Sequence, residues 1–127
     1  HIPLGHGERE LTRHAVRDFI IEGGIRYVQF DATRAGGLTE ALRIAHLAEQ
    51  HGVSIAPHLA PEIHAHLVAA FRQAAYGVET MGGADRNPLS WGLYGERMPL
   101  VEGRVRPPAG PGFGAEVDWS FVERHRA

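Results

Sequence analysis

The stretch VQFDATRAGGLTEALRIAHLAEQHGVSIAPH, residues 28–58, decides the fold. It opens on residues typical of strands and passes through a loop, "ATRAGG", into a segment with helical periodicity. That helix is predicted to have Thr39 as its N-cap and to end at Gly52, with an apolar stripe of Leu38, Leu42, Ala45 and Ala48. A second strand is predicted over 53–58. The order strand, loop, helix, strand predicts two parallel strands joined by a right-handed crossover.

The same pattern continues on both sides of this stretch. Upstream, a helix is predicted to begin at a Thr12 cap and to stop at Gly23. Downstream, a helix begins at Pro61, and a last short strand covers 76–79. The chain is therefore predicted to be an α/β fold with a parallel sheet, either an open doubly wound sheet or a closed barrel. Its glycine-rich runs lack the spacing of a dinucleotide or phosphate fingerprint.

The composition disfavours several classes of protein. With 127 residues, a net charge of −2 and a pI near 6.5, the chain has no sustained basic face for nucleic acid or an anionic membrane. All thirteen basic residues are arginine and there is no cysteine, which removes lysine bases and thiolate sites from this chain. A cytoplasmic protein is the default expectation. Because the opening "HIPLGHGE" reads like the end of a strand, we expect a fragment of a longer chain.

Polar residues follow each of the predicted strands. Glu8, Asp31, His58 and Glu79 each lie at the carboxyl end of a successive strand, where a parallel α/β fold places its active site. Asp31 is placed to accept a hydrogen bond from His58, which would fix the tautomer of the ring and raise the basicity of its other nitrogen. Glu8 suits an oxygen-preferring cation such as Mg²⁺. Two alternatives remain: Asp31 caps a turn, and Glu79 pairs with an arginine.

The other histidines are not predicted to form a metal cluster. His64 and His66 are two apart on a predicted helix, so they face different directions, and both are expected on its exposed surface. His6 precedes Glu8 and could reach the same rim, although an ordinary loop residue is the favoured interpretation.

Three segments, "GHGE", "VQFDATRAGGLTEALRIAHLAEQHGVSIAPHLAPEIHAHL" and "VETM", resemble in ordered succession the mandelate racemase group of the enolase superfamily. The resemblance implies the C-terminal part, about strands five to eight, of a (β/α)8 barrel of the TIM type. It implies a barrel portion over residues 1–97 and, over 98–127, a segment returning toward a capping domain that this chain does not contain. It also implies that Glu8 binds Mg²⁺, that Asp31 and His58 form a catalytic dyad, and that Glu79 hydrogen-bonds the enediolate of the substrate.

By the same resemblance, the expected enzyme is a Mg²⁺-dependent lyase that removes the proton next to a carboxylate and dehydrates an acid sugar to a 2-keto-3-deoxy acid. The alternative is a racemase or epimerase of a 2-hydroxy acid, and a non-catalytic binding protein is less favoured. Related groups with a lysine base are disfavoured, because this sequence has Asp31 at that position. The expected partners are a small carboxylate substrate, the missing N-terminal half of the barrel with its capping domain, and further copies in a homo-oligomer.

Overall fold

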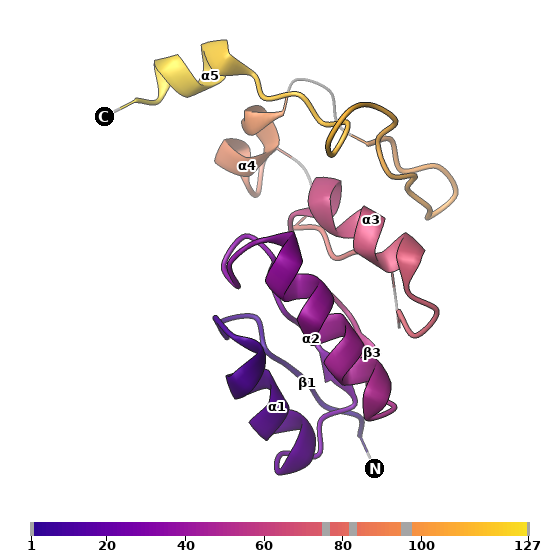
Figure 1. Ribbon diagram of the computed structural model, residues 1–127. Helices are drawn as coiled ribbons and strands as arrows, with labels where there is room; N and C mark the ends of the chain where they lie inside the picture. The colour runs from indigo at the N-terminus through magenta and orange to yellow at the C-terminus, as the bar shows by residue number, and fades with distance from the viewer. Residues whose placement is uncertain (1, 75–76, 82–83, 95–97, 127) are drawn as a thin grey trace. The chain divides into compact units, whose positions relative to one another are not determined.

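The computed structural model describes residues 2–74, 77–81, 84–94 and 98–126 (Figure 1). The chain divides into two compact units, His1–Thr80 and Met81–Ala127. The boundary predicted between residues 97 and 98 falls inside the second unit, next to residues outside the described part. That boundary therefore stays a prediction. No described helix is long and apolar enough to cross a membrane.

The first unit contains a parallel sheet of short strands in the order β1 (Gly5–His6), β2 (Tyr27–Val28) and β3 (Ser54–Ile55). The register pairs Val28 with His6 on one side and with Ile55 on the other. Backbone hydrogen bonds continue beyond the strands, because Ala56 N–H donates to the Val28 carbonyl and His58 N–H to the Phe30 carbonyl, both at 2.9 Å. The predicted parallel α/β arrangement is confirmed, whereas closure into a barrel is not seen in these residues.

Each strand of the sheet is followed by a helix: α1 (Arg13–Ile21), α2 (Leu38–Gln50) and α3 (Pro61–Ala70). Figure 1 shows α1 and α2 running side by side. Thr12 caps α1 as predicted, and Pro61 occupies the first turn of α3. The prediction of Thr39 as the cap of α2 is wrong. That cap is Gly37, whose φ of 89° suits glycine, and Thr39 lies in the first turn.

The core of the first unit lies between the sheet and the helices. Leu42, predicted to lie on the buried stripe of α2, is 41% exposed instead. The helix turns Ile44 and its alanines toward the core, because small side chains allow α2 to pack closely against β3 and α1. The fully covered apolar side chains of the first unit lie on α1, β2, α2 and β3 and in the loop after β2, and they include Val16, Val28, Phe30, Ala41, Ile44, Ala45, Ala48 and Ile55.

The predicted last strand, residues 76–79, is only partly testable. Tyr76 lies outside the described residues, and Gly77–Glu79 form no strand. A parallel bridge joins Ile55 to Ala74, just before this stretch, and Ile55 N–H donates to the Gln73 carbonyl at 3.1 Å. The chain therefore returns beside β3 before it reaches Glu79.

The second unit contains two short helices, α4 (Pro88–Leu93) and α5 (Trp119–Arg124). Asn87 and Asp118 cap them with their side chains. Gly92 lies against the ring of Phe121, where a Cβ atom would clash with the ring carbons. Glycine therefore allows α4 and α5 to approach closely.

Candidate active site

The parallel register gathers the predicted polar residues at the carboxyl ends of the strands. The bond from His58 N–H to Phe30 O brings His58 level with Asp31. Glu8 follows Gly7, whose φ of 123° is a conformation open to glycine and rarely adopted by other residues. We call Glu8, Asp31, His58 and Glu79 the rim residues.

His58 lies between two carboxylates. Its Nδ1 is 2.6 Å from Glu79 Oε2 and 3.6 Å from Glu8 Oε2. The backbone N–H of Leu59 also donates to Glu79 Oε2, at 3.3 Å. The side chain of His58 is 15% exposed, whereas those of Glu8 and Glu79 are 42% and 43% exposed. The site is therefore open on its carboxylate side. Among the described residues, the partners of Glu79 are His58 and the Leu59 N–H, and no arginine pairs with it.

Asp31 is sheltered and has other partners. Its Oδ1 accepts from Thr33 N–H at 2.9 Å and from the Thr33 hydroxyl at 2.7 Å, and Oδ2 lies 3.3 Å from Arg34 Nε. The structure therefore bears out the alternative that Asp31 caps a turn. In the structure the partner of His58 is Glu79, which differs from the expected bond to Asp31. The physical reason is that local donors already occupy Asp31 Oδ1, while the Glu79 carboxylate lies within hydrogen-bond distance of Nδ1.

This arrangement determines what His58 can do chemically. A carboxylate oxygen only accepts hydrogen bonds, so Glu79 selects the tautomer or charge state in which Nδ1 carries a proton. In the neutral ring Nε2 then keeps its lone pair and can accept a proton, as in other carboxylate–imidazole pairs. The pair is therefore suited to general acid–base chemistry.

The prediction that His64 lies on an exposed surface is wrong, because its side chain is fully buried. Ala32 N–H donates to His64 Nε2 at 3.0 Å, and His64 Nδ1 lies 2.6 Å from the Leu59 carbonyl oxygen. Helix side chains tilt toward the helix N-terminus, so a histidine in the second turn can reach the preceding loop. The position of His64 near the start of the helix is therefore the feature of the sequence that indicates its contact with the loop. His66 is half-buried rather than exposed.

His6 is engaged with α1. Its Nε2 lies 3.7 Å from Glu10 Oε1, and its ring packs edge-on against Phe19 with centroids 4.2 Å apart. His6 lies in β1 and not in a loop, which corrects that part of the expectation, and its side chain contacts Glu10 and Phe19.

Glu8 has the donor chemistry for a hard cation, since it offers accessible carboxylate oxygens close to the acid–base pair. Its Oε1 lies 3.6 Å from Arg9 Nε. In the described part of the chain, no group of three or more His, Cys, Asp or Glu side chains is arranged to hold a metal ion. Glu8 therefore fits as one ligand, and the described residues do not supply a complete set.

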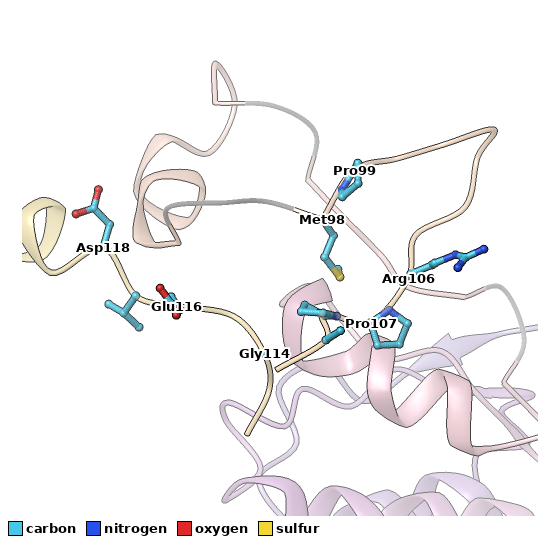
Figure 2. A pocket seen from close by; sticks show the side chains of 10 residues that line it. Met98, Pro99, Arg106, Pro107, Gly114, Glu116 and Asp118 are labelled. Carbon is cyan, nitrogen blue, oxygen red and sulfur yellow. The ribbon is translucent and has the colours of Figure 1, made fainter. Parts of the chain in front are cut away.

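A separate hollow of about 730 Å³ lies within the second unit. Figure 2 shows two of its lining residues, Arg106 and Asp118, on opposite sides. The Ser120 hydroxyl and the Phe121 N–H both donate to Asp118 Oδ1, and they hold the pKa of this carboxyl below its usual range. Asp118 is thus committed to capping α5, and the polar groups of this hollow do not converge as those of the rim do.

Comparison with known proteins addresses the family directly. The family model described as "Enolase C-terminal domain-like" matches residues 1–121. The chain belongs to this family. The resemblance to the enolase superfamily is thereby confirmed, and the rim residues lie in a member of a family whose relatives are enzymes.

Individual family members sharpen the comparison. A D-galactonate dehydratase from Ralstonia nicotianae is 34% identical over 100% of this chain and 36% of its own length. A mandelate racemase/muconate lactonizing enzyme from a marine actinobacterium, solved in complex with magnesium, has a TM-score of 0.87 at 27% identity, over 99% of this chain and 35% of its own. L-talarate dehydratase from Polaromonas sp. JS666, complexed with Mg and L-glucarate, has a TM-score of 0.80 at 34% identity, over 95% and 32%. The chain thus spans about a third of the length of these relatives.

Proposed function

We propose that these residues form strands five to eight of the (β/α)8 barrel of a Mg²⁺-dependent hydro-lyase, which dehydrates an acid sugar to a 2-keto-3-deoxy acid. The observation that carries the proposal is the placement of His58 between two accessible carboxylates: its Nδ1 lies 2.6 Å from Glu79 Oε2 and 3.6 Å from Glu8 Oε2. The names of the related dehydratases support the same class of substrate.

In the proposed reaction His58 Nε2 removes the proton from C2, next to the substrate carboxylate. The electron pair of the C2–H bond moves toward the carboxylate, and the ring becomes an imidazolium stabilised by the adjacent Glu79 carboxylate. The imidazolium then returns the proton to the hydroxyl on C3, which leaves as water. The enol that results tautomerises to the 2-keto-3-deoxy acid. His58 therefore acts first as the base and then as the acid.

Glu8 is proposed to supply one oxygen ligand for Mg²⁺, with the remaining ligands coming from outside this chain. When bound, the metal would stabilise the negative charge that develops on the substrate carboxylate. Glu8 Oε2 also lies 3.6 Å from His58 Nδ1, so the proposed ligand stands beside the proposed base.

Asp31 and Glu79 are each proposed to orient one part of the rim. Glu79 holds His58 Nδ1, while Asp31 shapes the neighbouring loop through Thr33 and Arg34. The assignment of Asp31 to a dyad with His58 remains part of the proposal for the substrate-bound enzyme.

The partners are proposals as well. The complete gene product is proposed to be a cytoplasmic homo-oligomer that supplies strands one to four and a capping domain, and its substrate is a small aldonic or aldaric acid. The expected boundary between the barrel portion and the returning segment stays near residue 97.

A panel of aldonic and aldaric acids offered to the complete gene product with Mg²⁺ tests the function. We expect a 2-keto-3-deoxy acid from at least one member of the panel. Solvent deuterium at C2 with inverted configuration and no keto acid would identify a racemase instead. If the folded protein forms neither product from any acid in the panel, both activities are rejected.

A further inference from the structure

His64 is a buried titratable group that the proposed reaction does not use. It lies on α3 with no solvent exposure, and its ring stands edge-on to Phe30 at 6.1 Å between centroids. A histidine in such a place needs hydrogen-bond partners for both ring nitrogens, because an unpaired buried polar group is costly. Both partners are present, and they belong to the two loops that carry the rim.

The partners determine the protonation of the ring. The backbone N–H of Ala32 can only donate, so Nε2 must accept with its lone pair, at 3.0 Å. The Leu59 carbonyl can only accept, so Nδ1 must donate, at 2.6 Å. His64 is therefore neutral with its proton on Nδ1. Burial, the largest influence, lowers its pKa and favours the same state.

The loop that His64 holds is strained. Leu59 and Ala60 both have left-handed backbones, with φ of 52° and 40°, which residues other than glycine rarely adopt. Such strain persists only where the surroundings hold it. The His64 ring holds the Leu59 carbonyl, and the Ala60 carbonyl accepts from the N–H groups of Ile63 and His64 at 3.0 Å.

The Nε2 side of the His64 ring bonds Ala32, the residue after Asp31. Its Nε2 is 3.8 Å from Asp31 Oδ1, too far for a hydrogen bond, so Asp31 stays with Thr33 while the ring binds the Ala32 peptide. One side chain thus joins the loop after β2 to the loop after β3. His58 stands directly before the strained turn, so any movement of that turn displaces its imidazole.

We propose that His64 is a positioning residue: by bonding Leu59 O and Ala32 N at once, it keeps the strained turn in the conformation that holds His58 in reach of the substrate. This role rests on the proposed function, because it acts through His58. His64 itself touches neither substrate nor metal in this scheme.

The test compares His64→Leu, His64→Asn and His64→Gln in the complete gene product with its Mg²⁺. His64→Leu removes both bonds, and we expect kcat to fall about 10- to 100-fold with KM nearly unchanged, as for other residues that orient a reacting group. Asn places an amide donor near the Leu59 carbonyl and Gln places an acceptor near Ala32 N, so one of them should recover part of kcat. His14→Leu, a change at an exposed histidine on α1, is the matched control and should keep wild-type kcat.

A second measurement does not depend on activity. The ¹⁵N ring signals of His64 should show a protonated Nδ1 and a bare Nε2 at pH about 6, where an ordinary histidine is largely protonated. A protonated Nε2 would overturn the proposal. If His64→Leu does not fold, wild-type kcat in both the Asn and the Gln variants would overturn it, and a lower kcat at constant KM in either would support it. An inactive wild type with the expected ring signals would reject the proposed function, whereas an active wild type with unaffected variants would reject only the positioning role.

Discussion

The rim has a sheltered part and an open part, and the two are built differently. In the sheltered part, the rim residue Asp31 and the α3 residue His64 have side chains that are 6% and 0% exposed. Asp31 bonds Thr33 in its own loop, and His64 bonds backbone groups of the loops after β2 and β3. In the open part, Glu8 and Glu79 are more than two-fifths exposed and have His58 between them. The sheltered residues fix the loops, and the open residues are the ones able to meet a ligand.

The largest expected effect lies in the open part. His58→Asn removes the nitrogen that takes the C2 proton, so kcat of the complete gene product should fall by about 10²- to 10⁴-fold. Steady-state kinetics on the preferred acid would measure this, with His14→Asn as the control. Unchanged turnover in His58→Asn would remove His58 from the mechanism. It would also contradict the assignment of the open part of the rim as the part that meets the substrate.

Beneath the rim, Ile55→Ala should act on stability. Ile55 is fully buried in β3, so the substitution should lower the free energy of unfolding by about 2–5 kcal/mol. Chemical denaturation of the complete gene product would show it as a lower midpoint. The matched control is Ile21→Ala, at a 59% exposed position on α1, where a much smaller change is expected. Equal losses at both positions would contradict the assignment of the core.

One pair of variants distinguishes the role of Glu79 in the open part from the role of Asp31 in the sheltered part. Glu79→Gln and Asp31→Asn should each lower kcat about 10- to 100-fold, because both orient the rim. Only Glu79→Gln should move the Nδ1 proton resonance of His58, because Glu79 is the hydrogen-bond partner in this structure. A shift in Asp31→Asn alone would instead make Asp31 the partner of His58.

The smallest effect is expected at an ion pair between α1 and α2. Arg13 binds Glu40 through its backbone N–H, at 3.0 Å, and its guanidinium, at 2.7 Å, and with Arg43 it holds the pKa of the Glu40 carboxyl below its usual range. A lowered carboxyl pKa contributes stability above the ordinary glutamate pKa and loses it as the pH falls through the lowered value. Glu40→Gln should therefore be less stable than the wild type at neutral pH and equally stable in acid. A difference independent of pH would contradict this, and turnover per folded molecule should not change.

Much of the first unit was predictable from local signals. Thr12, Pro61 and the glycines after α1 and α2 mark helix boundaries through backbone chemistry that the sequence displays directly. The cap of α2 differs from the predicted Thr39 because Gly37 acts through its positive φ and not through a side chain. Leu42 is exposed where the pattern predicts burial, because Leu42 and Ala41 lie on adjoining helix faces and tertiary packing decides which face turns inward.

The site was predictable by position but not in its contacts. That Glu8, Asp31 and His58 share one rim follows from the parallel order of the strands. Which carboxylate bonds His58 depends on side-chain reach and on the local donors at Asp31, neither of which strand order contains. The burial of His64 depends on the strained turn at Leu59 and Ala60, which no residue type there announces.

Proton loss from C2 of the substrate tests the central claim most directly. The complete gene product with Mg²⁺ would be incubated in D₂O with its preferred acid sugar, and the C2 proton followed by NMR in the wild type and in His58→Asn. The account predicts that the wild type loses the C2 proton as the 2-keto-3-deoxy acid forms, with deuterium incorporated at C3, and that His58→Asn does neither at a comparable rate. Wild-type rates of C2 proton loss in His58→Asn would contradict it.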